Sequence, residues 1–261
     1  MAVGQAPLPA LGESAGAYCN TPNRRVDCWR GKQATRASRT GETTLQSTKL
    51  HVLETLKRRR HGTVDELAGE LDLARATVRH HLDSLQRDGA VTYVEVRRET
   101  GRPHHLYSVT EHGDDLFPKS YVRLTNMVLH EIASLTAREV AGLDGRGVMQ
   151  MVFGRLADQL YESHADRLRG KSYAERAAEV VRILNDEGFL SQGEATDEGF
   201  RIVEFSCPYL RAAESHTAVC NLDLAFIRRA MPGSVERSER LAGGAPACTY
   251  VLREVAARST T

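Results

Sequence analysis

Apolar residues recur with helical spacing along the chain from about residue 47 onward. Leu50, Leu53 and Leu56 lie on one face of a first predicted helix. Thr63 is followed three residues later by Glu66, which is the capping-box pattern that marks the start of a second helix. The apolar face of that second helix consists of Val64, Leu67, Ala68 and Leu71. The pattern therefore predicts two short helices in succession.

A brief turn at residues 72–74 leads to a third predicted helix, whose apolar face carries Val78, Leu82 and Leu85. Two short helices joined by a turn of three to four residues form a helix-turn-helix. After Gly89 the apolar period changes from helical to alternating. Two strands are expected there, at 91–96 and 104–109, with a basic turn at 97–103 between them. This order of elements predicts a winged-helix DNA-binding domain over residues 46–110.

Polar residues of the third helix project away from its apolar face and are the expected DNA readers. They are Arg75, Thr77, Arg79 and His80, with Asp83 beside them. Arginine can bond two guanine acceptors at once, and threonine can contact base edges or thymine methyl groups. The wing offers a second set of cations for phosphates or a neighbouring minor groove. That set consists of Arg97, Arg98, Arg102, His104 and His105.

An apolar stripe follows in the linker predicted over residues 111–146. Its members, spaced over four helical turns, are Tyr121, Leu124, Val128, Ile132 and Leu135. Such a stripe must be buried against something. Packing within one chain and a homodimer seam are both compatible with it. We favour the seam, because helix-turn-helix proteins commonly bind paired half-sites as dimers.

The remainder, residues 147–255, is predicted to be a second domain of the α+β class. Helices are expected at 148–168, 173–184 and 220–231, and strands at 200–205, 235–241 and 248–255. The expected fold is therefore α+β throughout: a winged helix, a linker helix and a C-terminal sensor domain.

Composition indicates a cellular compartment and limits the kinds of partner that the chain can bind. The 261 residues are 41% hydrophobic and 26% charged with a formal net charge of +1, so any nucleic-acid surface must be local. No run approaches the roughly 20 apolar residues of a membrane span, and no signal peptide is evident, which favours the cytoplasm. Residues 1–45 are rich in Gly, Pro, Ser and Thr and are predicted to be a disordered tail. Cys19 and Cys28 within it are expected to be incidental thiols.

Three further cysteines lie in the second domain. Cys207 opens a Cys-Pro-Tyr sequence, Cys220 follows thirteen residues later, and Cys248 follows after another twenty-eight. Thiolates suit iron–sulfur clusters, zinc or copper(I), and cytoplasmic cysteines are seldom structural disulfides. Free cysteine is also a common core residue. Spacing alone leaves both interpretations open.

Residues 48–255 resemble the SufR family, the iron–sulfur repressors of bacterial suf cluster-assembly operons. The resemblance rests on the winged helix, on Gly101-Arg102-Pro103 followed by Leu106-Tyr107, on Cys207-Pro208-Tyr209 and on the three-cysteine spacing. Some relatives carry a fourth cysteine in this region. This chain has Ser234 and no fourth cysteine there, which places it with the three-cysteine branch.

The resemblance implies a homodimeric repressor that binds an inverted-repeat operator in double-stranded DNA while its cluster is present. Cys207, Cys220 and Cys248 would hold a cluster of the [4Fe-4S] type, with [2Fe-2S] as the alternative. A fourth ligand is then needed. His216 is one candidate, because four residues before Cys220 it would share a helical face with that cysteine. A small molecule, solvent or a carboxylate such as Asp223 would serve as well.

Two other functions stay open at this point. The cysteines could serve a zinc- or thiol-redox-sensing winged-helix regulator, which metal content would distinguish from a cluster protein. The second domain could instead be a cluster-dependent enzyme. Against an enzyme, the chain has no phosphate-binding glycine loop, no zinc-protease helix motif and no closely spaced cysteine triplet. We therefore expect a regulator and not an enzyme.

Overall fold

The computed structural model describes residues 42–97 and 103–254, with side chains from residue 47 onward. Arg98 and Arg102 of the predicted wing tip, and Cys19 and Cys28, lie outside the described residues. Within the described ranges, no helix combines the length and the apolar character that crossing a membrane requires.

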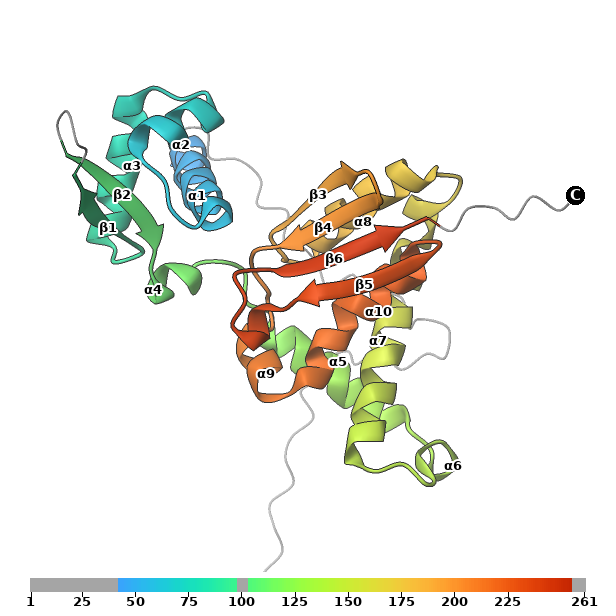
Figure 1. The fold of residues 1–261 in the computed structure, drawn as a ribbon. Helices are drawn as coiled ribbons and strands as arrows, with labels where there is room; N and C mark the ends of the chain where they lie inside the picture. The colour runs from blue at the N-terminus through green and yellow to red at the C-terminus, as the bar shows by residue number, and fades with distance from the viewer. Residues whose placement is uncertain (1–41, 98–102, 255–261) are drawn as a thin grey trace, which may run out of the picture.

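The winged helix consists of α1 (Glu42–Arg59), α2 (Val64–Leu71), α3 (Arg75–Arg87), β1 (Val91–Val96) and β2 (His104–Val109) (Figure 1). The predicted capping box is present, because Thr63 accepts from the Glu66 amide and the Glu66 carboxylate accepts from the Thr63 amide. Helix α1 begins at Glu42, so the predicted end of the tail at residue 45 is wrong. Residues 42–49 carry one large apolar residue, Leu45, and the apolar period therefore did not mark this first part of the helix.

A small apolar core holds the three helices and the hairpin together. Its fully covered members include Val52, Leu67, Val78 and Leu82. The hairpin is also tied to the loop after α1, where Gly62 and Tyr107 exchange both backbone hydrogen bonds at 3.0 and 2.9 Å. The wing is consequently fixed relative to α3, which is the helix that it must accompany onto DNA.

The chain leaves the wing through α4 (Glu111–Asp114), which is packed tightly against the winged helix. A Cβ atom on Gly113 would lie 2.0 Å from the carbonyl oxygen of Ala90, so only glycine fits there. Phe117 then packs into the winged-helix core. Leu190 and Phe205 of the second domain also contact this core. The predicted linker is therefore anchored at its beginning to both domains.

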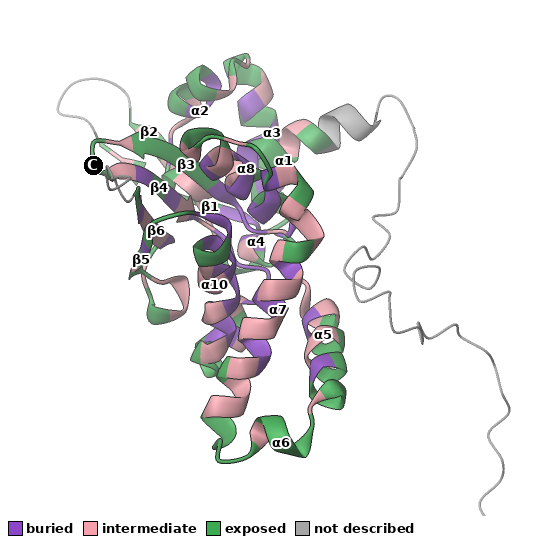
Figure 2. Ribbon diagram, turned by 90° about the vertical axis from the view of Figure 1, so that its right-hand side faces the viewer, coloured by how far each residue is buried: buried purple, intermediate pink, exposed green. Residues whose placement is uncertain are grey.

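Helix α5 (Tyr121–Ser134) lies along α7 (Gly145–Leu168), with the short α6 (Ala137–Val140) connecting them. Leu124 is buried in this packing, and the buried Glu131 accepts hydrogen bonds from Arg155 at 3.2 Å and Gln159 at 2.8 Å. Figure 2 shows the outer face of α5 as exposed. The predicted stripe is thus divided: part of it packs within the chain, while Ile132 faces outward.

The second domain has a four-stranded antiparallel sheet in the order β3-β4-β6-β5. Its strands are β3 (Ser191–Thr196), β4 (Gly199–Glu204), β5 (Ser234–Glu239) and β6 (Cys248–Arg253). Helices α8 (Tyr173–Asp186) and α10 (Asn221–Ala230) pack on the sheet, and α7 packs on α10 (Figure 1). Together with the winged helix, this arrangement confirms the predicted α+β class.

Strand β3 was not predicted, because its sequence Ser-Gln-Gly-Glu-Ala-Thr lacks apolar alternation. It is an edge strand beside β4, and Gly193 leaves room for the Phe200 ring across the pair. The short α9 (Leu210–Ser215), η1 (Thr217–Cys220) and η2 (Leu241–Gly243) were also missed, since each is too short to establish a period.

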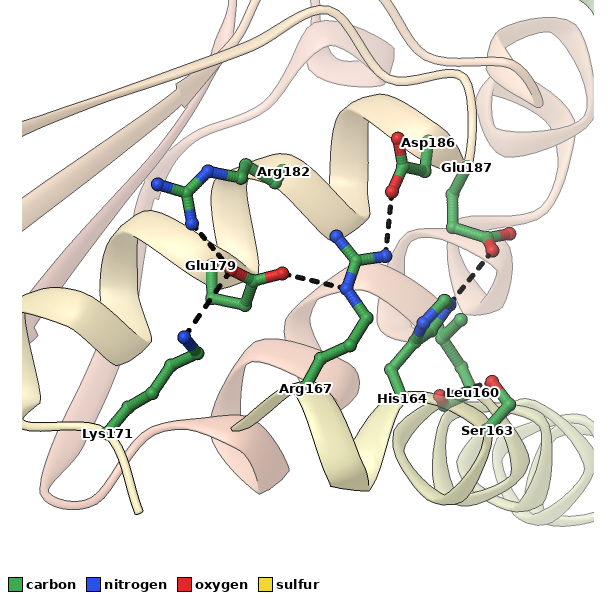
Figure 3. Close-up of polar contacts among 9 residues, drawn as sticks. All are labelled: Leu160, Ser163, His164, Arg167, Lys171, Glu179, Arg182, Asp186 and Glu187. Carbon is green, nitrogen blue, oxygen red and sulfur yellow. Dashed lines mark hydrogen bonds and ion pairs between the residues drawn. The ribbon is translucent and has the colours of Figure 1, made fainter. Parts of the chain in front are cut away.

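Charged side chains join the end of α7 to α8 (Figure 3). Arg167 donates to Glu179 and to Asp186, both at 2.7 Å, and Arg182 donates to Glu179 at 2.5 Å. Glu187 lies 3.3 Å from the His164 ring and 2.5 Å from Arg123 of α5. This network fixes the helical layer that supports the sheet.

Candidate DNA interface and cysteine centre

The predicted reading helix presents the expected face to solvent. Arg75, Arg79 and His80 are exposed and Thr77 is half-buried, whereas Val78 is fully covered. Arg75 forms an ion pair with Asp65 of α2 at 3.0 Å, and both partners remain largely exposed. Such a pair is weak in water, so the Arg75 guanidinium can exchange it for a phosphate or a base.

A groove of about 410 Å³ runs between α3 and the wing. Arg79 and Asp83 line it from α3, and His104, His105 and Tyr107 line it from β2. His105 stacks on Tyr93 with ring centroids 3.9 Å apart, which holds the strand's polar face in place. Arg97 is exposed at the end of β1. The structure therefore brings the predicted helix residues and the described wing residues to one side of the domain.

His81 belongs to the opposite, inner face of α3. Only 3% of it is exposed, and its Nε2 atom has no hydrogen-bond partner among the described residues. Burial lowers the pKa of this imidazole, with the neighbouring His80 and Lys49 adding to the effect. His81 is therefore a residue of the winged-helix core, whereas the adjacent His80 is exposed.

The three cysteines of the second domain converge on one small cavity, although 41 residues separate the first from the last. Cys207 follows β4, Cys220 ends η1 at the start of α10, and Cys248 begins β6. All three are buried, free thiols. The other lining residues are Phe189, Tyr209, Leu210, Ala213, Val219, Asp223, Leu241 and Ala242. Fold topology, and not sequence proximity, assembles this centre.

Two of the sulfur atoms accept backbone hydrogen bonds. The Tyr209 amide donates to Cys207 Sγ at 3.4 Å, and the Leu241 amide donates to Cys248 Sγ at 3.3 Å. Burial is the largest cause that raises the pKa of all three thiols, and the nearby Asp223 and Glu204 carboxyls raise them further. Thiolates in this environment need a cation to compensate them, and metal ligation deprotonates thiols outright.

A buried polar cluster lies beside the sulfur atoms. Tyr250 Oη donates to Asp223 at 2.7 Å and lies 3.2 Å from Glu204, and Arg237 stands 3.7 Å from Asp223. Burial raises the pKa of Asp223, and burial with the neighbouring Asp223 raises that of Glu204 much further. Burial and the neighbouring Asp223 carboxyl thus both disfavour the ionised form of Glu204.

Ligand atoms of Glu204, Asp223 and Cys248 all lie within 4.8 Å of one another. Three thiols and the Asp223 carboxyl line one cavity with Glu204 next to it, and this donor set suits a soft or borderline metal. Backbone amides that donate to sulfur are a feature of thiolate centres. The cavity itself measures about 10 Å³, comparable to one water molecule. The three sulfur atoms do not form a set within 4.8 Å of one another among the described residues, so one ion bound by all three requires their side chains to turn inward, and a multinuclear cluster requires the cavity to widen.

The predicted ligand His216 does not share this cavity. The expected helical face is absent, because α9 ends at Ser215, His216 has an extended backbone with φ −135°, and η1 begins only at Thr217. Its exposed side chain lines a separate apolar groove between α5 and α7. The geometric premise for His216 as a ligand is therefore wrong.

Sequence reasoning named Asp223 but missed Glu204, Arg237 and Tyr250. One signal was available: Phe200, Ile202 and Glu204 occupy the same face of an alternating strand, so a carboxylate stands where the period calls for an apolar side chain. The contributions of Arg237 and Tyr250 depend on the pairing of β5 with β6, which no local pattern reveals.

Leu210 and Leu241 line the cysteine cavity and also a second crevice of about 380 Å³. The far wall of that crevice belongs to the winged helix and α4, and includes Lys57, Arg60 and Asp114. The segment 207–211, which leads into α9, also contacts the linker. The Ser120 amide donates to the Pro208 carbonyl at 3.1 Å, and Arg211 pairs with Asp115 at 3.3 Å. The cysteine centre and the DNA-binding domain are thus separated by one layer of side chains.

Comparison with known proteins supports the DNA-binding half. Residues 50–95 match the IclR helix-turn-helix domain family. A similar solved structure is that of a transcriptional regulator homologue protein from Pyrococcus horikoshii OT3, which is 21% identical over 34% of this chain and 85% of its own, with a TM-score of 0.25. No curated protein matches the chain. The chain is a DNA-binding transcriptional regulator with an IclR-type helix-turn-helix, and the SufR resemblance stays a prediction.

Proposed function

We propose that this regulator controls iron–sulfur cluster assembly genes of the suf type, and that the state of its cysteine centre sets its affinity for DNA. The observation that carries the proposal is the convergence of Cys207, Cys220 and Cys248 on one buried cavity. That cavity also shares the side chains of Leu210 and Leu241 with a crevice beside the winged helix. An inert core would not need three thiols with backbone donors aimed at two of them.

Cys207, Cys220 and Cys248 are the residues that would hold an iron–sulfur cluster, [4Fe-4S] by preference and [2Fe-2S] as the alternative. When bound, such a group supplies a bridge between three segments of the fold that exists only while iron and sulfide are available. The amides of Tyr209 and Leu241 stabilise negative charge on two sulfur atoms. The surrounding apolar side chains keep solvent away from the centre.

Leu210 and Leu241 are placed to transmit a change from the centre to the DNA-binding domain. Both must shift when the narrow cavity widens, and both abut the crevice walled by the end of α1 and by α4. The coupling required is small. A difference of about 1.4 kcal/mol between the two states changes DNA affinity tenfold.

We also propose that the regulator acts as a homodimer on an inverted repeat, with α5 at the seam. Val122, Leu129 and Ile132 are among the most exposed large apolar side chains of the described residues, and all three lie on this helix. Two-fold symmetry would place the same helix on both sides of the interface. Light scattering of the full chain, compared with a Leu129→Glu variant, tests this seam.

A zinc- or thiol-sensing centre is the second candidate, and the small cavity favours it. The three cysteines and Asp223 that line it match in number the four ligands of a structural zinc site. Thiolate–zinc sites are colourless, whereas iron–sulfur clusters absorb in the visible range. We assign no catalytic activity to either form.

Anaerobic reconstitution with iron and sulfide tests the proposal. We expect visible charge-transfer absorption that disappears in the Cys207→Ser, Cys220→Ser and Cys248→Ser variants, with Ser206→Ala as a buried control. Mobility-shift assays should show tight operator binding by the loaded form and weak binding by the apo form. A colourless protein with stoichiometric zinc would establish the second candidate. Equal DNA affinity in both states would rule out the switch.

A further inference from the structure

The cysteine centre offers three thiolates and therefore leaves one coordination position to another group. Among the described residues, two carboxyls lie within 4.8 Å of a cysteine sulfur as part of a common set of ligand atoms, those of Asp223 and Glu204 with Cys248. Only Asp223 of these two also lines the cavity that the three cysteines share. Asp223 thus meets two separate geometric criteria for the fourth position.

Its place in the chain fixes the Asp223 side chain near Cys220. Cys220 is the N-cap of α10, and Asp223 lies three residues later in the first turn, so the two side chains project from neighbouring positions of one helix face. The Leu224 amide donates to Asp223 Oδ1 at 2.6 Å, and Tyr250 Oη donates to Oδ2 at 2.7 Å. These bonds orient the carboxyl group before any metal arrives.

Asp223 has a guanidinium beside it, whereas Glu204 has an oxygen atom without a partner among the described residues. Arg237 stands 3.7 Å from Asp223 and also donates to the backbone carbonyl of Cys220, so one guanidinium connects both residues. Glu204 is fully buried, and its Oε1 atom has no hydrogen-bond partner among the described residues. An unpartnered polar atom at such depth costs stability unless a ligand or proton satisfies it.

Resting on the function proposed above, we propose that the Asp223 carboxylate is the fourth ligand of the cysteine centre, with Glu204 and Tyr250 as positioning residues that hold it in place. The centre then has three sulfur ligands and one oxygen ligand. Oxygen is a poorer partner than thiolate for iron in a sulfur-rich site. An iron bound at Asp223 would accordingly be the one released first when the cell runs short of iron.

Cobalt(II) provides a direct test, because its spectrum reports the number of thiolate ligands and does not depend on cluster assembly. The full-length protein is titrated with Co²⁺ anaerobically as wild type, Asp223→Asn, Asp223→Cys and the exposed control Glu236→Gln. We expect a tetrahedral d–d envelope with three-thiolate charge transfer in the wild type and in the control. Asp223→Asn should alter the d–d envelope, and Asp223→Cys should raise the thiolate charge-transfer intensity by about one third, as a fourth sulfur ligand requires.

Iron release from the reconstituted protein gives the second readout. We expect a chelator to remove iron from Asp223→Asn at least about tenfold faster than from the wild type, and from Asp223→Cys more slowly than from the wild type. Glu204→Gln should fall between the wild type and Asp223→Asn. Circular dichroism establishes that each variant is folded. The Asp223→Cys result separates ligation from a merely structural role, because sulfur is a much weaker hydrogen-bond acceptor for Tyr250 Oη than a carboxylate is.

The two hypotheses fail in different ways. Wild-type protein that gives no thiolate charge transfer with either Co²⁺ or iron and sulfide contradicts the proposed function itself. Wild-type protein with three-thiolate bands, together with an Asp223→Asn spectrum and release rate that match it, overturns Asp223 ligation alone.

Discussion

The winged helix and the second domain differ in the polar side chains that they bury within their apolar cores. In the winged helix the covered residues are almost entirely apolar, with Thr55 and His81 as the polar members among the described residues. The second domain, together with helix α5 packed on it, covers Glu131, Glu179, Glu187, Glu204 and Asp223 as well as three cysteines. The predicted DNA-contacting side chains of the first domain, such as Arg79 and His80, lie on its surface. The candidate ligand groups of the second domain, which are thiols and carboxyls, lie in its core.

This difference matches what each domain has to contact. DNA is a large partner that can only be read from a surface, so the core of the reading domain needs only to be rigid. A metal or cluster is small and is best held where water is excluded, even though buried charges then cost stability. Core substitutions should therefore damage the two domains in different ways.

Leu82→Ala should produce the largest change. Leu82 is fully buried in the winged-helix core, so the variant should lose about 2–5 kcal/mol of unfolding free energy and most of its DNA binding. Its Co²⁺ spectrum should be unchanged, because the two cores form separate apolar clusters. Urea unfolding and cobalt titration of the same preparation measure both effects. Parallel loss of metal binding would mean that the two domains behave as one cooperative core.

Arg79→Ala should weaken specific DNA binding without affecting stability. An arginine that contacts base edges contributes about 1–3 kcal/mol of discrimination, which corresponds to roughly 5- to 150-fold in affinity. Arg169→Ala, at an exposed site beyond α7, is the matched control. Fluorescence anisotropy with an operator selected from random duplexes and with a shuffled duplex measures the effect. An equal loss of affinity for both duplexes would show that Arg79 contacts phosphates and not base edges.

His81 should make the winged helix sensitive to acid. Burial lowers the pKa of His81 in the folded state, while the unfolded chain takes up a proton near the ordinary value of 6.5. Stability from this residue is therefore full above pH 6.5 and decreases as the pH falls toward the folded pKa, by at most about 1.4 kcal/mol per pH unit. Urea unfolding between pH 7.5 and 5.5 should show this slope in the wild type and in His130→Gln. The slope should disappear in His81→Leu. If it persists in that variant, another titratable group causes the pH dependence of the unfolding free energy.

Two equivalent capping boxes give the smallest and most closely matched comparison. Thr63 with Glu66 begins α2, and Ser172 with Glu175 begins α8. Thr63→Ala and Ser172→Ala should each cost about 1 kcal/mol of unfolding free energy. Only Thr63→Ala should also lower DNA affinity, because Thr63 borders the groove between α3 and the wing. A comparable loss of DNA affinity in Ser172→Ala would show that α8 influences the reading surface.

The sequence predicted the winged helix well because local signals specify it. A capping box, helical apolar periods and a change to alternation after Gly89 are each visible within a few residues, and the IclR-type match over residues 50–95 supports the result. The cysteine centre was predictable only in part. The three cysteines could be named as candidates, but their convergence depends on the strand order β3-β4-β6-β5. The error at His216 arose from extending a helix through residues where the chain breaks it.

One feature of the centre bears on how quickly the regulator can respond. The single turn η2 covers the cysteine cavity with Leu241 and Ala242 and is closed by short-range hydrogen bonds, Gly243 to Arg240 at 3.0 Å and Gly244 to Leu241 at 2.9 Å. Opening such a turn costs far less than unfolding the sheet beneath it. We therefore expect the time constant for loading and emptying the centre to follow the opening rate of η2. The response of the regulator can then be retuned by substitutions in one turn, with its DNA sequence preference unchanged.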